Sequence, residues 1–323
     1  MIFSRGELET ACTLVHAQML PTPLYNWPQL SRLVGANLWV KHENHAPTGA
    51  FKVRGGITFI DWLRQAHPDC KGIITATRGN HGQSQARAAS SVGLKAVIYA
   101  PRGNSPEKNT AMRAYGADLR EFGNDFDEAR EEAVRVAAQE GLFLVPSFHL
   151  ELVRGVATYA MEMFIAQPDL DRVYVPIGCG SGICGVIAAR DALGLRTKII
   201  GVVSERAQTA LLSRQSGQMT ATQTALTFAD GLAVRVPVAE AFAIYATGTE
   251  DIIAVSEDEV ADAVRHYYLA THNLAEGAGA AALAAALKQR EKIAGKNVGV
   301  ILSGANIDAS WMAEILAGKT PKL

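Results

Sequence analysis

The segment TGAFKVRGG places Lys52 between Phe51 and Val53, with glycines on both sides of this short apolar stretch. Apolar surroundings disfavour the charged form of an amine, and a neutral amine can attack a carbonyl carbon. Lys52 is therefore a candidate Schiff-base lysine. The alternative is a lysine that extends its charged end into solvent from an amphipathic helix, as most lysines do.

A first glycine-rich turn follows in TATRGNHGQSQA, where a short apolar run leads into Gly79, Asn80 and His81 and then into a helical pattern. Such a turn leaves the first backbone N–H groups of the helix free to bind an anion such as a carboxylate. The alternative is an ordinary helix cap by the Asn80 side chain.

A second turn, VPIGCGSGICG, matches the pattern G-x-G-x-x-G at Gly180, Gly182 and Gly185, and Glu205 ends the next apolar run. This arrangement is typical of dinucleotide-binding folds, so an NAD-dependent oxidoreductase using residues 180–185 is one hypothesis. Glycine turns at helix starts bind other phosphates equally well. The motif alone therefore predicts a phosphate site.

Two further segments carry polar residues at expected strand or helix ends. In VILSGANID, Ser303 ends an apolar run and Asp308 is placed to cap the last helix. In NLAEGAGAAALAAAL, Glu276 precedes a helix of small residues, where a capping role or a role in binding a monovalent cation is expected.

The elements that must hold these residues alternate between apolar β-branched runs and helical patterns, as in KAVIYA followed by EKNTAMRAYGA. This alternation predicts an α/β protein with mostly parallel sheets covered on both faces. The runs before residue 150 and after residue 170 each form a complete set, so we expect two three-layer αβα lobes with the site in a cleft between them.

Composition restricts the partners. The 323 residues carry a net charge of −1, which gives no reason to expect nucleic acid or a membrane surface as a partner, and no stretch is apolar enough to span a bilayer. The four cysteines, Cys12, Cys70, Cys179 and Cys184, form neither a disulfide framework nor a zinc motif. We expect a cytoplasmic protein that acts on a small molecule.

Together, KHENHAPTGAFKVRGG, TRGNHGQ, VPIGCGSGICG and ILSGANID resemble, in order and spacing, the fold type II pyridoxal-phosphate enzymes, also called tryptophan synthase β-subunit-like. The similarity is greatest to the serine/threonine dehydratase (threonine ammonia-lyase) and serine racemase family. The resemblance extends over nearly the whole chain. It implies a large cofactor-binding domain of residues 1–64 and 149–323, with a small domain of residues 65–148 inserted in it.

The resemblance also implies roles for individual residues. Lys52 matches the lysine that binds pyridoxal 5'-phosphate and later moves protons at the substrate Cα, and Ser303 matches the hydroxyl that meets the pyridine nitrogen. The remaining cofactor positions are Phe51, Asn80, Gly178, Cys179, Gly180, Ser181 and Gly182. The positions implied for the substrate are Thr77, Arg78, Gly79, Asn80, His81 and Phe148.

A neutral hydroxyl at the pyridine nitrogen gives a weaker electron sink than a carboxylate would, which favours loss of a β-leaving group over transamination. The predicted reaction is therefore dehydration and deamination of a β-hydroxy-α-amino acid to a 2-oxo acid and ammonia. A pyridoxal-phosphate protein that has lost turnover is the alternative outside catalysis. The family implies a homodimer or homotetramer.

Several positions depart from the family pattern. Arg78 replaces the serine that serine racemase uses on the opposite cofactor face, Ala50 replaces a serine near the substrate, and Phe148 and His149 stand where acidic residues are common. Phe148 would suit phenylserine, whereas Arg78 would suit 3-hydroxyaspartate or would pair with a carboxylate such as Glu43. Acids that hold a divalent cation in relatives are replaced by Val203, Ala207 and Thr209, so no such metal site is expected.

Overall fold

The computed structural model describes residues 1–322, and the chain forms two compact units. The smaller unit is Lys52–Gly155, and the larger unit combines Met1–Phe51 with the chain from Val156 onward. The sequence-based domain boundaries near residues 65 and 148 stay a prediction.

The larger unit is built on a six-stranded sheet in the order β1-β2-β10-β7-β8-β9. All neighbouring strands of this sheet run parallel except the edge pair β1–β2. The strands are β1 Leu24–Asn26, β2 Asn37–His42, β7 Arg172–Pro176, β8 Lys198–Ser204, β9 Asp251–Val255 and β10 Asn297–Leu302.

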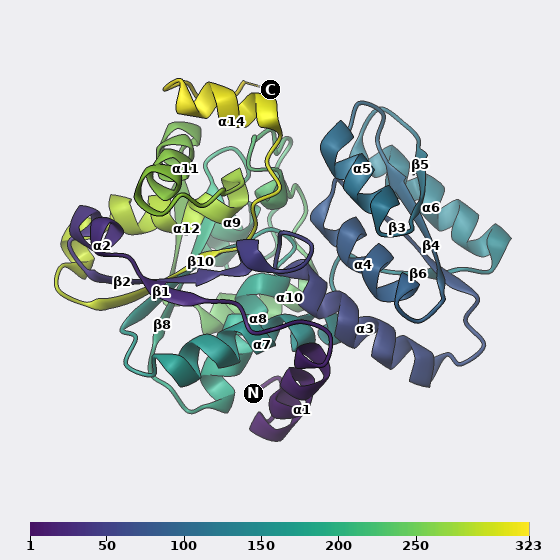
Figure 1. Ribbon diagram of the computed structural model, residues 1–323, viewed down its shortest axis with the longest axis horizontal. Coiled ribbons are helices and arrows are strands. Elements are labelled where there is room, and N and C mark those ends of the chain that lie inside the picture. The colour runs from purple at the N-terminus through teal and green to yellow at the C-terminus, as the bar shows by residue number, and fades with distance from the viewer. Residues whose placement is uncertain (323) are drawn as a thin grey trace. The chain divides into compact units, whose positions relative to one another are not determined.

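Helices cover both faces of this sheet (Figure 1). One face packs on α2 Pro28–Val34, α11 Glu257–Thr271, α12 Gly277–Lys288 and α14 Ala309–Leu316, and the described core there includes Leu38, Val300 and Leu283. The other helices of the unit are α1 Arg5–His16, α8 Ser181–Ala192, α9 Thr209–Ser216, α10 Ala239–Gly248 and α13 Arg290–Ile293, with short 3₁₀ turns η1 Glu43–His45 and η2 Asp230–Leu232.

The smaller unit has a four-stranded parallel sheet in the order β5-β4-β3-β6. Its strands are β3 Gly72–Ala76, β4 Lys95–Ala100, β5 Asp118–Glu121 and β6 Phe143–Leu144. Its helices are α3 Lys52–Ala66, α4 Asn80–Ser90, α5 Pro106–Ala114 and α6 Phe126–Glu140. Helix α7, Leu150–Ala166, begins in the smaller unit and ends in the larger one.

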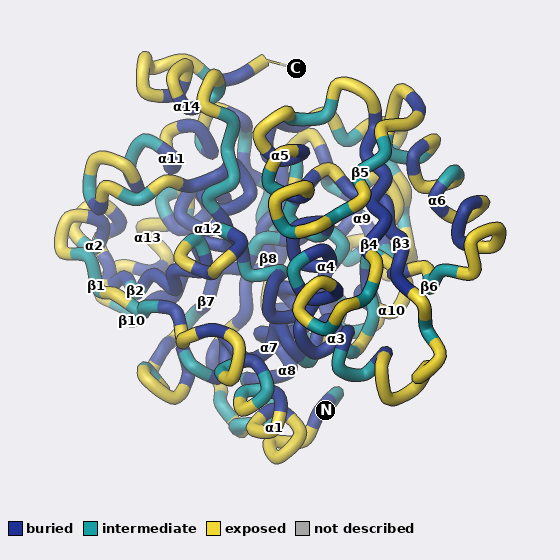
Figure 2. Tube along the Cα trace, turned by 45° about the vertical axis from the view of Figure 1, so that its right-hand side comes forward, coloured by how far each residue is buried: buried dark blue, intermediate teal, exposed yellow. Residues whose placement is uncertain are grey.

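Alternating side chains of β3 show why its sequence is apolar throughout. Ile73 packs in a core with Phe59 and Leu63 of α3, whereas Ile74 faces the opposite core with Ala133 and other residues of α6. A strand covered on both faces has no polar side, as in a parallel sheet. In Figure 2, β3 and β4 accordingly run as dark blue, buried tube. Both units are thus three-layer αβα structures with mostly parallel sheets, which confirms the predicted fold class.

Helix α7 approaches α3 very closely within the smaller unit. A Cβ added at Gly155 would lie 2.2 Å from the carbonyl oxygen of Arg54, and one added at Gly55 would lie 2.8 Å from the carbonyl oxygen of Leu152. The Thr58 hydroxyl donates to the carbonyl of Glu151 over 2.6 Å. Glycine at both positions therefore allows the contact that fixes the start of α3, where Lys52 lies.

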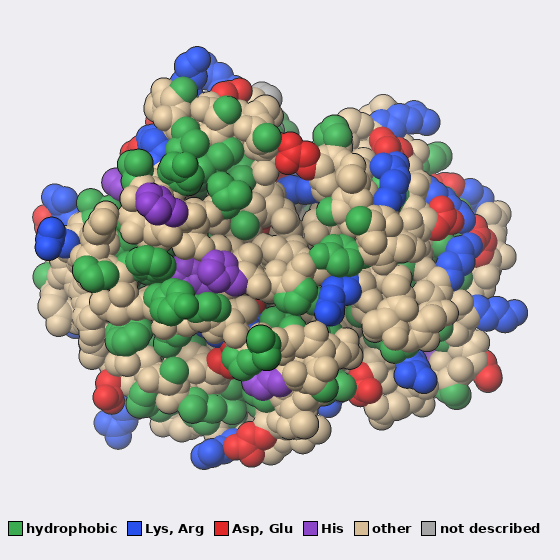
Figure 3. Space-filling view, viewed as in Figure 1, with side chains coloured by type: hydrophobic (Ala, Val, Ile, Leu, Met, Phe, Trp, Pro, Cys, Tyr) green, Lys and Arg blue, Asp and Glu red, His purple; other side chains and the backbone are tan. Residues whose placement is uncertain are grey.

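A polar network orders the chain between β2 and Lys52. His42 Nε2 accepts from Trp27 Nε1 over 2.9 Å, and His42 Nδ1 lies 3.1 Å from Asn44 Oδ1. Burial first and the neighbouring His45 second lower the pKa of His42 to about 4, so the ring is neutral at pH 7. Figure 3 shows imidazoles among apolar side chains in this part of the larger unit.

No helix among residues 1–322 combines the length and the apolar character needed to cross a bilayer. The cysteines Cys12, Cys70, Cys179 and Cys184 are free thiols.

Candidate functional site

Lys52 is the first residue of α3, and its side chain is half-buried. The Ser84 hydroxyl of α4 donates to the Lys52 carbonyl over 2.6 Å, which joins the starts of the two helices. A Cβ at Gly56 would lie 2.4 Å from Ser84 Oγ, so a glycine is needed where α3 and α4 touch. The contact fixes the Lys52 backbone relative to the Asn80–His81 turn.

The turn before α4 contains five of the predicted substrate residues, Thr77, Arg78, Gly79, Asn80 and His81. Thr77 ends the run after β3, its N–H donates to the Tyr99 carbonyl, and its hydroxyl accepts from the Gly79 N–H over 3.0 Å. Helix α4 begins at Asn80 with Gly79 in the cap position, so the alternative that Asn80 caps the helix is wrong. No side-chain cap occupies the first N–H groups of α4, which fits the predicted anion site.

His81 lies beside Lys52 as a neutral imidazole. Burial first and the Lys52 charge second lower its pKa to about 3. Within residues 1–322, its buried Nε2 atom has no hydrogen-bond partner. His81 therefore stays uncharged beside Lys52 at pH 7.

Arg78 is exposed, and within the described smaller unit no hydrogen bond or ion pair involves its side chain. Residues 71–106 contain no aspartate or glutamate, so the strands and helix around this turn offer no carboxylate partner. Lys108 packs its aliphatic chain against Gly79, where an added Cβ would lie 2.7 Å from Lys108 Cδ. Arg78 and Lys108 therefore place two cationic side chains at this turn, and Glu107 directly precedes Lys108 in the first turn of α5. Phe148, the other specificity candidate, is buried.

In the larger unit, the segment 48–51 pairs with the segment 303–306. The Phe51 N–H donates to the Ser303 carbonyl over 3.1 Å, and the Ala305 N–H donates to the Gly49 carbonyl over 2.8 Å. Glu276 lies against this pair, because a Cβ on Gly304 would be 2.4 Å from Glu276 Oε1. Glu276 occupies the cap position of α12, but its side chain makes no cap hydrogen bond there.

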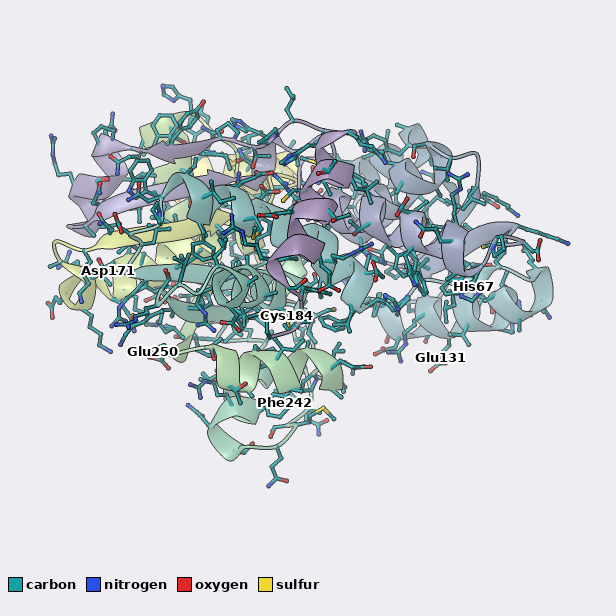
Figure 4. The ribbon with its side chains drawn as sticks, turned by 90° about the horizontal axis from the view of Figure 1, so that it is seen from below. His67, Glu131, Asp171, Cys184, Phe242 and Glu250 are labelled. Carbon is teal, nitrogen blue, oxygen red and sulfur yellow. The ribbon has the colours of Figure 1, made fainter. Side chains whose placement is uncertain are left out.

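The predicted phosphate loop, residues 178–182, follows β7 and includes the first two residues of α8. Gly180 has φ +101° and an added Cβ would lie 2.5 Å from Ala241 Cβ of α10, so this position requires glycine. Gly180 caps α8 without a side-chain hydrogen bond. Gly178 and Cys179 are half-buried, whereas Gly180 and Ser181 are buried. Figure 4 shows Cys184 on α8 and Phe242 on the neighbouring α10 that supports this loop.

Phe51 contacts the phosphate loop within the larger unit. An added Cβ on Gly182 would meet Phe51 Cζ at 3.6 Å, and the Phe51 ring stacks edge-on against Tyr159 with centroids 6.0 Å apart. The Tyr159 hydroxyl donates to the Gly182 carbonyl over 3.3 Å. Phe51, the loop 178–182 and Ser303 are thus brought together, and Lys52 follows Phe51 directly in the chain.

These features fit a phosphorylated cofactor held near an amine. Positions 178, 180 and 182 of the loop are glycines. An added Cβ at position 178 would clash with Gly231, one at position 180 would clash with Ala241, and one at position 182 would face the Phe51 ring. The start of α8 presents N–H groups that suit phosphate oxygens. Ser303 is buried at the end of β10, where its hydroxyl can serve a ring nitrogen.

Sequence reasoning missed the turn 227–231, which touches the phosphate loop. The carbonyl oxygen of Gly231 would lie 2.1 Å from a Cβ on Gly178. The Asp230-Gly231 dipeptide is a turn signal that could have located the turn, although not its contact with Gly178.

Comparison with known proteins agrees with this arrangement. Residues 15–304 match the family model described as "Pyridoxal-phosphate dependent enzyme". A putative threonine dehydratase of Sinorhizobium fredii is 33% identical over 98% of this chain and 96% of its own. L-threonine ammonia-lyase of Thermotoga maritima is 34% identical over 89% of this chain and 71% of its own. The processed form of threonine deaminase isoform 2 from Solanum lycopersicum superposes with a TM-score of 0.88 at 31% identity, covering 97% of this chain and 94% of that one.

Proposed function

Because this chain belongs to the family of pyridoxal-phosphate dependent enzymes, we propose that it is an ammonia-lyase that converts a β-hydroxy-α-amino acid into a 2-oxo acid and ammonia. The substrate loses its Cα proton and its β-hydroxyl group as water. Hydrolysis then takes up one water, so the net reaction releases ammonia alone. The similarity to a putative threonine dehydratase and to L-threonine ammonia-lyase supports threonine or serine as the basic substrate type.

Pyridoxal phosphate, when bound, withdraws electrons from the substrate Cα and so acidifies its proton. Lys52 would supply the amine that holds the cofactor, and the N–H groups of the loop 178–182 would bind its phosphate. Asn80 would serve the ring oxygen, and the Ser303 hydroxyl would serve the ring nitrogen. A neutral hydroxyl at that nitrogen favours rapid loss of the β-leaving group.

Lys52 then acts as the base that removes the Cα proton. Neutral His81 adds no positive charge of its own beside Lys52. The substrate carboxylate binds at the start of α4, where no side-chain cap occupies the first N–H groups of the helix. Arg78 and Phe148 select the substrate side chain.

The observation that carries the proposal is the hydrogen bond from the Phe51 N–H to the Ser303 carbonyl, together with the contact of the Phe51 ring with Gly182. These contacts bring Ser303 and the loop 178–182 to Phe51, the residue before Lys52. Ser303 is proposed to serve the cofactor ring, and the loop is proposed to bind its phosphate. Within the smaller unit, the Ser84 hydroxyl of α4 donates to the Lys52 carbonyl, which joins the helix after the substrate turn to the start of α3.

An absorption spectrum of the purified protein with pyridoxal phosphate tests the proposal. We expect a violet band that disappears in Lys52→Ala and persists in the control Lys71→Ala, because Lys71 is exposed and directly precedes β3. A band that survives Lys52→Ala contradicts the proposal. Tight NADH binding without a pyridoxal-phosphate band would instead favour the oxidoreductase hypothesis.

Turnover is measured as 2-oxo acid formed from serine, threonine, 3-hydroxyaspartate and phenylserine, with and without K⁺. A lysine-dependent band without any 2-oxo acid would favour the catalytically silent protein. Stimulation by K⁺ would support a monovalent cation site at Glu276, which lies beside Gly304.

The substrate side chain is a finer part of the proposal. Exposed Arg78, which makes no hydrogen bond or ion pair within the described smaller unit, favours a second carboxylate as in 3-hydroxyaspartate. Phe148 supports phenylserine as the second candidate, since an aromatic wall adds about 0.5–1.5 kcal/mol of ring pairing to burial.

We also propose a cytoplasmic homodimer or homotetramer. Exposed Tyr25, Leu269 and Leu274 of the larger unit are apolar side chains that suit a subunit contact. Size-exclusion chromatography with light scattering measures the mass of the assembly. The mass of a monomer would contradict the proposed oligomer.

A further inference from the structure

Glu257 is a buried carboxylate that lies outside the residues discussed so far. It is the first residue of α11, and only 9% of its surface is exposed. Its Oε1 accepts from Ser204 Oγ over 2.9 Å and from Thr227 Oγ1 over 2.7 Å, and its Oε2 accepts from the Phe228 N–H over 3.0 Å. A buried carboxylate with three donors is a strong anchor, since hydrogen bonds to charged groups exceed neutral ones in strength.

Two of these three donors belong to the turn 227–231, which has no strand or long helix to hold it. Within that turn, the Ala229 N–H donates to Thr227 Oγ1 over 3.1 Å, and the Leu232 N–H donates to the Ala229 carbonyl over 2.8 Å. Thr227, Phe228 and Ala229 are all buried. Glu257 therefore fixes the start of the turn. The hydrogen bonds within the turn then fix the position of the following residues up to Gly231.

The far side of the turn meets the phosphate loop and α12. A Cβ on Gly178 would lie 2.1 Å from the Gly231 carbonyl oxygen, and a Cβ on Gly231 would lie 2.8 Å from Ala278 Cβ. A Cβ on Gly277 would lie 2.8 Å from Ala229 Cα. The turn thus packs backbone against backbone between α12 and the loop. If the turn moved towards the loop, the Gly231 carbonyl would clash with the backbone at Gly178, because no flexible side chain lies between them.

The geometry points to Glu257 as a positioning residue for the phosphate loop: it holds the turn 227–231 against Gly178 and thereby maintains the loop shape that binds the cofactor phosphate. This role rests on the proposed function, in which residues 178–182 bind that phosphate. Glu257 differs from its neighbour Glu259, which forms the capping box with Ser256 and pairs with Lys288 over 3.0 Å.

The test compares two probes that differ only in the phosphate. Apo protein is titrated with pyridoxal phosphate and with pyridoxal, and each Kd is read from the absorption change. Glu257→Gln keeps the side-chain size but turns an amide N–H₂ towards donors, and we expect it to weaken pyridoxal phosphate binding roughly tenfold. Pyridoxal binding should change less than about twofold, because no phosphate contact exists to lose.

Glu259→Gln is the matched control, since it removes the same negative charge from the first turn of the same helix. It should leave the ratio of the two Kd values unchanged. An unchanged ratio in Glu257→Gln overturns the inference. A wild-type protein that does not prefer pyridoxal phosphate to pyridoxal would instead contradict the proposed phosphate loop itself.

Thr227→Val provides a second, milder variant that removes one hydroxyl donor and keeps the shape of the residue. It should raise the Kd of pyridoxal phosphate a few-fold without affecting that of pyridoxal. If Glu257→Gln fails to fold, Thr227→Val alone decides, and equal effects on both probes would contradict the inference.

Discussion

The amide N–H of Phe51 donates a hydrogen bond of 3.1 Å to the carbonyl oxygen of Ser303. This bond uses only main-chain atoms. It ties the residue before Lys52 to the end of β10 and leaves the Ser303 hydroxyl available for another partner. A substitution at Ser303 can therefore remove the hydroxyl and keep the main-chain hydrogen bond to Phe51.

Replacing Ser303 by alanine should reduce turnover and preserve the fold. The main-chain bond to Phe51 remains, whereas the hydroxyl at the proposed ring nitrogen is lost, so kcat should fall roughly tenfold, the effect of one hydrogen bond. Steady-state kinetics give kcat, and urea unfolding should show an unchanged midpoint. An unchanged kcat would remove Ser303 from the proposed site.

Two glycines of the phosphate loop should differ in how strongly an alanine substitution destabilises the protein. A methyl group at position 178 would lie 2.1 Å from the Gly231 carbonyl oxygen, whereas one at position 182 would meet the Phe51 ring at an ordinary 3.6 Å. Gly178→Ala should lower the free energy of unfolding by about 1–3 kcal/mol, as overpacking does. Gly182→Ala lies in the first turn of α8 and should change it by less than about 1 kcal/mol.

Urea denaturation of the two variants in parallel provides the measurement, with pyridoxal phosphate affinity as the second readout. Each variant serves as the other's control, because both add one methyl group to the same loop. Equal loss of stability would show that the contact of Gly178 with Gly231 does not restrict the loop.

The strands and glycine turns could be predicted because their signals are local. The run GIITA is apolar at every position since β3 is covered on both faces, and Gly180 precedes a helix since only glycine readily adopts its φ of +101°. Lys52, Asn80 and Ser303 were selected from such segments and from the family resemblance. The three-residue strand β1 and the two-residue strand β6 were not predicted, because so few residues carry no period.

Contacts between distant segments were beyond sequence reasoning. Glu257 and Thr227 lie 30 residues apart, and nothing in SEDEV distinguishes the buried Glu257 from the capping Glu259. Lys41 likewise forms a buried ion pair with Glu162, separated by 121 residues. Only the packed structure shows which carboxylate faces inward.

Arg78→Ala should alter substrate preference more than overall activity. If Arg78 binds a second carboxylate, the variant should lose roughly ten- to a hundredfold in kcat/KM for 3-hydroxyaspartate and less than about threefold for serine. Arg102→Ala is the control, because Arg102 is another exposed arginine of the smaller unit, outside the substrate turn.

Binding of unreactive ligands separates this result from turnover. Aspartate and asparagine have the same shape, differ in one charge, and carry no β-hydroxyl to eliminate. The wild-type protein should prefer aspartate, and Arg78→Ala should remove that preference. If every substrate and ligand ratio is unchanged in Arg78→Ala, the residue does not shape specificity.

His42 should make the larger unit sensitive to acid. Its pKa is about 4 in the folded protein and near 6.5 in an unfolded chain, so the unfolded state binds the proton more readily. Above pH 6.5 both states are neutral and the difference has no effect. Between pH 6.5 and 4 the folded state should lose about 1.4 kcal/mol per pH unit from this residue, and below that range the loss should stop growing.

His42→Gln isolates this contribution, because an amide keeps an acceptor for the Trp27 indole N–H and does not titrate. The measurement is the free energy of unfolding in urea at several values between pH 7 and 4, followed by tryptophan fluorescence. As the pH falls, the free energy of unfolding should decrease more steeply for the wild type than for His42→Gln. The difference in slope should correspond to the uptake of about one proton on unfolding. Parallel curves would mean that the pKa of His42 is not lowered in the folded protein, and that the acid sensitivity of this unit arises from other groups.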